Sequence, residues 1–206
     1  MTVREEDART AHLARTLWQE DGSALPVDIG RIAQRFAFSF EYRRAPRGFR
    51  GALFAAQHLI VINAGLPTCQ QRYVIAHELG HWLVGTRRLR IRQARVERVC
   101  QLFAAHLLLP PDRVAASARA AYGRADLLDQ LAADYLVTPS AMCIHLQQLG
   151  LLPGGATHTL EREIADAAWC DPQLTADLTP REDLRVPLWE VDIDAAYPSG
   201  VLNSEF

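Results

Sequence analysis

Residues 73–82 read Tyr-Val-Ile-Ala-His-Glu-Leu-Gly-His-Trp, and this stretch decides both the expected fold and the expected chemistry. Its two histidines, His77 and His81, are four positions apart. On an α-helix they are therefore neighbours on one face, about 5–6 Å apart at Cβ. Pro67 suits the first turn of such a helix, and Gly85 supplies a C-terminal stop. We therefore predict one helix that presents two imidazoles to one ion.

A third ligand must come from elsewhere, because a catalytic zinc ion needs three protein ligands and an open position for water. Glu97 is the best candidate, since it lies on a second predicted helix that has an apolar packing face. His106 lies about 180° further round that helix at 3.6 residues per turn and is excluded as a ligand. Cys100, one turn beyond Glu97, is more often a small core residue than a fourth ligand. The predicted metal ligands are His77, His81 and Glu97.

Glu78 directly follows the first ligand and points to its flank, where it can accept a proton from metal-bound water. The ion would lower the pKa of that water toward about 7 and polarise the scissile carbonyl. Zinc is the expected ion, although Mn²⁺ or Fe²⁺ also suits two histidines and one carboxylate. The competing interpretation is a chance motif with half-buried or solvated histidines, and with Glu97 in surface ion pairs to neighbouring arginines. The apolar residues around the motif and its terminating glycine favour the metal site.

Periodicity places the motif within an α+β fold. Alternating apolar residues predict strands over residues 38–43, 51–55 and 59–63. Helices are expected over residues 7–18, 27–35, 69–83, 93–109, 112–121, 126–135 and 139–149. The expected architecture is a small, mostly antiparallel sheet packed on zincin-type active-site helices, with an α-helical extension.

Prolines and glycines suggest three segments. Pro110 and Pro111 end the ligand helix, so residues 1–110 are expected to form the metallopeptidase core. Residues 111–152 are expected to form a helical extension that resembles a helix-turn-helix. Residues 153–206 follow a Pro-Gly-Gly linker and form a tail of uncertain structure, with one helix suggested over 160–169 and one strand over 188–193.

Composition excludes several classes of protein. The 206 residues are 49% hydrophobic and 22% charged, which is typical of globular proteins and argues against disorder. No apolar stretch approaches the roughly 18 residues of a membrane span, and the first residues lack a signal-peptide core, so we expect a cytoplasmic protein. The four cysteines, Cys69, Cys100, Cys143 and Cys170, contain no C-x-x-C pair and are interpreted as reduced, mostly buried thiols.

Charge argues against direct nucleic-acid binding. The formal net charge is −2, and residues 125–160 contain no arginine or lysine, although they include the helix-turn-helix-like pair. Phosphate neutralisation supplies most non-specific DNA affinity, so an uncharged or acidic recognition helix is a poor DNA ligand. The arginines over residues 87–98 are interpreted as a solvated loop, with guidance of an acidic peptide segment as the alternative.

Four stretches together resemble the ImmA/IrrE family of metallo-endopeptidases. They are Asp28-Ile-Gly-Arg-Ile-Ala, Leu59-Ile-Val-Ile-Asn, Ala76-His-Glu-Leu-Gly-His, and Glu97 followed by Phe103-Ala-Ala-x-Leu-Leu-x-Pro110. The resemblance covers about residues 27 to 152. It implies a gluzincin-like peptidase that cleaves or inactivates helix-turn-helix repressors. This chain departs from the family pattern at Cys100, where a small residue is usual, and at Gln101, where Asn or Asp is usual.

The resemblance also implies the protein's biological role. The expected function is a zinc-dependent endopeptidase that makes limited cuts in a helix-turn-helix repressor and so induces stress, prophage or mobile-element genes. The alternatives are an anti-repressor that binds without cutting and, less favoured, a DNA-binding regulator. The family identifies no residue here that stabilises the transition state, and Tyr122, His145 and His158 are the remaining candidates.

Overall fold

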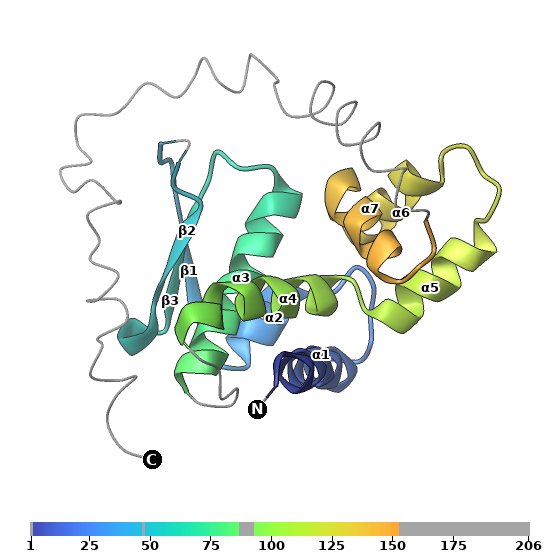
Figure 1. The fold of residues 1–206 in the computed structure, drawn as a ribbon. Helices are drawn as coiled ribbons and strands as arrows, with labels where there is room; N and C mark the ends of the chain where they lie inside the picture. Colours follow the sequence, from blue (N-terminus) through green and yellow to red (C-terminus); the bar gives the residue numbers. More distant parts are fainter. Residues whose placement is uncertain (1, 47, 87–92, 153–206) are drawn as a thin grey trace.

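The computed structural model describes residues 2–46, 48–86 and 93–152, and its elements form an α+β fold (Figure 1). They are α1 (Val3–Glu20), α2 (Ile29–Gln34), β1 (Ser39–Arg43), β2 (Gly51–Phe54), η1 (Ala55–Gln57), β3 (Leu59–Asn63), α3 (Thr68–Gly85), η2 (Gln93–Arg95), α4 (Val96–Leu108), α5 (Pro111–Ala120), α6 (Leu127–Tyr135) and α7 (Pro139–Gln148). The predicted α+β class is confirmed. The helix and strand suggested in the tail lie outside the described residues.

The three strands form a mixed sheet in the order β1-β3-β2. Strand β3 pairs parallel to β1 and antiparallel to β2. This corrects the expectation of a mostly antiparallel sheet. The chain reverses direction between β1 and β2 and again through the 3-10 turn η1, so β3 runs in the direction of β1 and is inserted between the other two strands.

Helices cover the sheet in successive layers (Figure 1). Helix α3 packs on β2 and β3, α4 packs on α3, and α1 packs on α4. Leu79 and Leu83 of α3 and Phe103 and Leu107 of α4 are fully buried in the core between these layers. Burial of side chains of this size stabilises the fold by about 1.5–3 kcal/mol each. Residues 77–81 therefore lie on a helix that is enclosed between the sheet and α4.

Local signals fix the ends of several helices. Thr2 and Glu5 form a reciprocal capping box at the start of α1. Asp28 caps α2, because its carboxylate accepts a hydrogen bond from the amide of Arg31 at 3.0 Å. Thr138 caps α7 in the same way with the amide of Ala141 at 3.0 Å.

Helices α5, α6 and α7 bury a second apolar cluster. Its buried members are Leu109, Val114, Ala118, Leu131, Ala132, Tyr135, Met142 and Leu146. Val137, between α6 and α7, packs against this cluster and against the main core. The segment boundary drawn after residue 110 stays a prediction. Within the described ranges, no helix has both the length and the apolar character needed to cross a membrane.

Candidate metal centre

His77, His81 and Glu97 converge where α3 crosses the start of α4. The Nε2 atoms of His77 and His81 are 3.1 Å apart. The carboxylate oxygens of Glu97 lie 3.4 Å from Nε2 of His77 and 3.0 Å from Nε2 of His81. All three ligand atoms lie within 4.8 Å of one another. The structure therefore brings together the three residues that the sequence predicted as ligands.

Close packing of α3 on α4 makes this convergence possible. Gly80 lies between the two histidines, and a Cβ atom built there would lie 3.2 Å from Cα of Cys100 and 3.3 Å from the ring of Phe103. Real Cβ atoms rarely approach so closely, so the absent side chain lets the backbones meet. The first turn of α4 then carries Glu97 beside the histidines.

Helix α1 fixes the start of α4 through charge. Arg95 forms an ion pair with Glu6, whose side chain is only 1% exposed. Arg98 donates two hydrogen bonds to the Asp7 carboxylate at 2.6 and 2.7 Å. These bonds also hold the pKa of Asp7 below its usual value. Because Arg95 and Arg98 flank Glu97 in sequence, the α1 carboxylates hold the segment that carries the third candidate ligand.

The environment keeps both imidazoles neutral, which is the form that binds a metal. Burial, with a smaller effect from His77, lowers the pKa of His81 to about 4, although Glu97 opposes the change. Burial also lowers the pKa of His77. In addition, Nδ1 of His77 is buried without a hydrogen-bond partner among the described residues. Two neutral nitrogens and one carboxylate form a donor set that fits a divalent cation such as zinc.

Glu78 lies on α3 next to this donor set and is buried. The negative charges of Glu97 and Glu78 both help to raise the pKa of the Cys100 thiol on α4. Glu78 therefore lies near the interface between α3 and α4. Cys100 itself is fully buried, and burial is the main reason that the pKa of its thiol is raised. A thiol held in its protonated form is a poor metal ligand. Among the described residues, the candidate metal group contains only the two histidines and Glu97.

Two further side chains, which the sequence analysis did not identify, lie near the candidate metal centre. The Tyr73 ring stacks on His77 with centroids 6.1 Å apart and an interplanar angle of 23°. The positive charge of Arg50 acts on both Tyr73 and His77. Tyr73 precedes His77 by four positions, so helical spacing alone indicates this contact. Arg50 precedes β2, and no local pattern connects it with α3.

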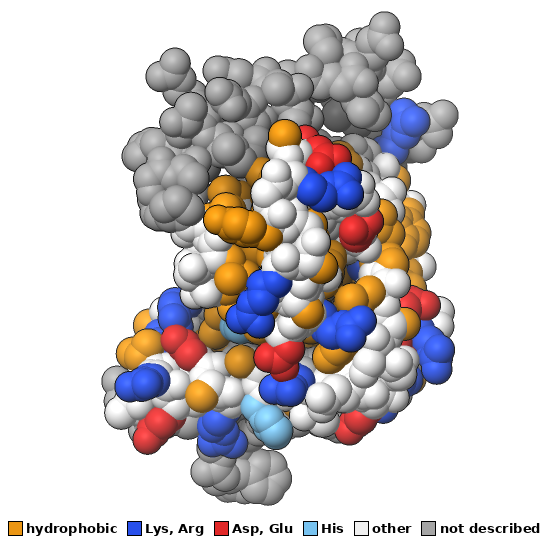
Figure 2. All heavy atoms as spheres, turned by 90° about the vertical axis from the view of Figure 1, so that its right-hand side faces the viewer, with side chains coloured by type: hydrophobic (Ala, Val, Ile, Leu, Met, Phe, Trp, Pro, Cys, Tyr) orange, Lys and Arg blue, Asp and Glu red, His pale blue; other side chains and the backbone are white. Residues whose placement is uncertain are grey.

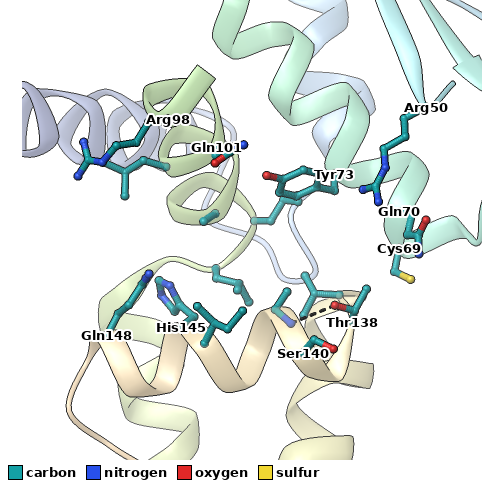
Figure 3. A pocket seen from close by; sticks show the side chains of 17 residues that line it. Arg50, Cys69, Gln70, Tyr73, Arg98, Gln101, Thr138, Ser140, His145 and Gln148 are labelled. Carbon is teal, nitrogen blue, oxygen red and sulfur yellow. Dashed lines mark hydrogen bonds between the residues drawn. The ribbon is translucent and has the colours of Figure 1, made fainter. Parts of the chain in front are cut away.

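A cavity of about 860 Å³ adjoins the centre between the α3–α4 pair and α7 (Figure 3). Tyr73 and Gln101 line it on the side of the metal-binding helices. Gln101 is one turn beyond Glu97 on α4. Thr138 and Ser140 line the opposite wall. The candidate metal centre therefore adjoins a space large enough for several side chains of a ligand.

The other residues singled out in the sequence have different surroundings. His106 faces His145 of α7, with ring centroids 5.8 Å apart, and is not part of the metal group. His145 is 2% exposed and lines the far part of the cavity. Tyr122 follows α5 and is 87% exposed, and His158 lies outside the described residues. A role for these side chains in transition-state stabilisation stays untested.

The cysteines bear out part of the interpretation based on sequence. Cys100 and Cys143 are buried and Cys69 is partly buried, and none of the three forms a disulfide within the described residues. Cys170 and arginines 87–92 lie outside the described residues.

Comparison with known protein families gives one finding. The model of the IrrE N-terminal-like domain, peptidase M78, matches residues 37–147. This range is more than half of the 206 residues, and it contains Glu78 and all three candidate ligands. The chain has no match among curated proteins.

Proposed function

The chain belongs to the peptidase M78 family of the IrrE N-terminal-like domain and is a metallopeptidase; from this we propose that it makes limited cuts in a transcriptional repressor. The proposed substrate is a protein of the helix-turn-helix type, and its cleavage relieves repression of stress, prophage or mobile-element genes. The resemblance to ImmA/IrrE peptidases supports the choice of substrate. The convergence of His77, His81 and Glu97 at the edge of a cavity supports the hydrolytic activity most strongly.

His77, His81 and Glu97 are the proposed metal ligands, and Glu78 is the proposed general base. These three residues would hold a divalent cation, with zinc as the first choice and Mn²⁺ or Fe²⁺ as alternatives, which would activate water and polarise a peptide carbonyl. Glu78 accepts a proton from the attacking water as its oxygen bonds to the carbonyl carbon. It then donates that proton to the nitrogen as the carbon–nitrogen bond breaks. Burial of Glu78 and neutral histidines suit these roles.

Surface charge supports a protein rather than a nucleic acid as the macromolecular partner. In the view that faces the helical extension, acidic and basic side chains are interspersed over the described surface (Figure 2). A DNA-binding face normally concentrates arginine and lysine to neutralise phosphates. We therefore propose that the substrate is a polypeptide. We also propose that the protein acts in the cytoplasm.

Co-expression tests the proposal. The helix-turn-helix regulator encoded nearest to this gene is expressed with wild type or with Glu78→Gln, and its intact mass is measured. Wild type should produce one defined cut. Glu78→Gln should lose about 10²- to 10⁴-fold in cleavage rate while it keeps its metal, because only the proton acceptor is removed.

The same experiment separates the alternative functions. A regulator that stays whole but co-purifies with both variants would replace proteolysis by anti-repressor binding. A regulator that is neither cut nor bound would refute the substrate assignment and leave the peptidase family membership unaffected. Salt-dependent binding of DNA by the purified chain would favour the DNA-binding regulator.

A further inference from the structure

The cavity beside the metal centre has an apolar floor. Leu102, Ala105 and Leu108 of α4 form one side of it, and Val137, Ala141 and Ile144 form the other. Ile144 is 44% exposed, which is unusual for a large aliphatic side chain on the rim of a cavity. Exposed apolar surface that is bordered by polar groups is typical of a binding site. The floor therefore suits the apolar side chains of a peptide.

The cavity reaches Tyr73, which lies next to the candidate metal centre. Tyr73 lines the cavity and also stacks on His77. Gln101 lines it from the turn of α4 that follows Glu97. A peptide whose scissile bond lies at His77 and Glu97 can thus extend past Tyr73 into the cavity without leaving the protein surface.

Charge distinguishes one end of this cavity. Among the described residues, no aspartate or glutamate lines the cavity, whereas Arg50 and Arg98 do. Both terminal nitrogens of Arg98 already donate hydrogen bonds to the Asp7 carboxylate. The Arg50 side chain is exposed and forms no ion pair or hydrogen bond with any residue in the described ranges, although the backbone carbonyl of Arg50 accepts a hydrogen bond from the amide of Asn63 at 2.9 Å. Its guanidinium is therefore available to a ligand.

The start of α3 adds to the positive potential at the same end. Cys69 and Gln70, in the first turn of α3, line the cavity. Figure 3 shows Arg50 beside Gln70 and Cys69, and His145 and Gln148 at the other end. Within the part of the chain that the structure describes, no side chain forms a cap hydrogen bond at the N-terminus of α3. An uncapped helix N-terminus favours negative charge, so it complements the same type of ligand group as Arg50.

We propose that this cavity selects substrate segments that combine apolar side chains with an aspartate or glutamate, and that Arg50 binds the carboxylate. The proposal rests on the proposed endopeptidase function and adds a substrate class to it. Arg50 is a specificity-determining residue in this account. Binding at Arg50 fixes the position of the peptide relative to His77, so the acidic residue occupies a constant distance from the cleaved bond.

Peptide selection tests the proposal independently of cleavage. The zinc-loaded Glu78→Gln variant is immobilised and exposed to synthetic dodecapeptides randomised over Asp, Lys, Leu, Ser and Gly. Retained peptides are sequenced by mass spectrometry. The selection is repeated with two double variants, in which Glu78→Gln is combined with Arg50→Glu or, as a matched control, with Arg113→Glu. Arg113 is an exposed arginine of α5 that does not line the cavity.

The expected result is about a fivefold enrichment of Asp over Lys at one position, as for a partly exposed ion pair. Arg50→Glu should invert this preference toward Lys, whereas Arg113→Glu should leave it unchanged. A purely structural role for Arg50 would weaken binding without inverting the preference. Failure to retain peptides, absence of acidic enrichment, or enrichment that persists in Arg50→Glu overturns the proposal.

Cleavage of the retained peptides by the active enzyme is measured separately. If acidic peptides are retained through Arg50 but stay uncut, the peptidase assignment of Glu78 fails and the recognition site stands. If peptides are cut with no acidic preference, the enzyme assignment stands and the recognition site fails.

Discussion

The α3–α4 half and the helical extension differ in how their buried polar side chains are paired. In the first region these side chains face a charged partner, and in the second, among the described residues, they do not. Around the metal centre, Glu6 is buried against Arg95, and His77 and His81 face Glu97. In the extension, the cluster of α5 to α7 is apolar, and neither ring nitrogen of His145 has a well-formed hydrogen bond among the described residues. Helices α3 and α4 therefore hold the candidate metal ligands, while the extension supplies one wall of the cavity.

The comparison predicts where substitutions act. Changes near α4 should alter stability and metal affinity together, because the same ion pairs hold the helix and the candidate ligand. Changes in the extension should alter stability or peptide selection and leave metal affinity unchanged.

The largest expected effect on stability is at Glu6. Glu6→Ala leaves the charge of Arg95 without its buried partner and should lower the free energy of unfolding by about 3 kcal/mol. Zinc affinity should fall as well, since the start of α4 loses its anchor. Chemical denaturation and calorimetric zinc titration measure the two quantities.

Glu20→Gln is the matched control on the same helix, because Glu20 pairs with Arg35 at a half-exposed site. Its expected cost is below about 1 kcal/mol. The account of α1 as an anchor would be contradicted if Glu6→Ala and Glu20→Gln cost the same.

A pH-dependent loss of stability is expected from the extension. Burial lowers the pKa of His145 to about 4, and the charge of His106 on α4 adds to this effect. Burial also lowers the pKa of His106, although Asp7 opposes the change. As the pH falls from about 6.5 to 4, the unfolded chain takes up a proton at His145 that the folded chain does not. The free energy of unfolding should therefore fall over this window by as much as about 3 kcal/mol.

His145→Leu should remove the part of this slope that comes from His145, because the substituted side chain does not titrate, whereas the buried His77, His81 and His106 still contribute. Urea denaturation of the zinc-loaded proteins at several pH values measures the difference between the two chains. Equal slopes for wild type and His145→Leu would show that His145 does not sense pH. Zinc affinity at pH 7 should be the same in both.

Gly80→Ala tests the close approach of α3 and α4. The added methyl group would press on Cys100 and Phe103. Overpacking of this kind costs about 1–3 kcal/mol, partly offset by the better helix propensity of alanine. A net loss of about 1 kcal/mol and weaker zinc binding are expected by denaturation and titration.

Gly85→Ala provides the control within the same helix, because nothing lies within 4 Å of a Cβ atom there. It should be neutral or slightly stabilising. A stable Gly80→Ala protein with unchanged zinc affinity would show that the helix contact does not position the ligands.

At Tyr135 in the extension, the expected effect is on stability alone. Its hydroxyl lies 3.0 Å from that of Ser117, and the side chain is buried. Tyr135→Phe removes this hydrogen bond and should cost about 1 kcal/mol. Zinc affinity should not change, and a change would show that the extension and the metal centre are coupled.

Local patterns in the sequence predicted the ligand helices well. The four-residue spacing of His77 and His81 and the prolines after α4 act through helix geometry, which needs no knowledge of distant contacts. Glu97 was identified by a packing argument, and the structure places it beside the histidines.

Pairings between distant segments were harder to predict. The position of β3 between β1 and β2 depends on how successive chain reversals are arranged in space. The proposed role of Arg50 depends on the segment before β2 and the start of α3 lining the same cavity. Neither has a periodic signal, because tertiary packing decides both.

Metal content tests the central claim most directly. Wild type, Glu78→Gln, Glu97→Gln and His81→Asn are stripped with a chelator, reconstituted with Zn²⁺, Mn²⁺ or Fe²⁺, desalted and analysed by elemental mass spectrometry. The account predicts about one ion per chain for wild type and Glu78→Gln, and a large loss for Glu97→Gln and His81→Asn. Full metal content in Glu97→Gln and His81→Asn, or none in wild type, would contradict a centre built from His77, His81 and Glu97.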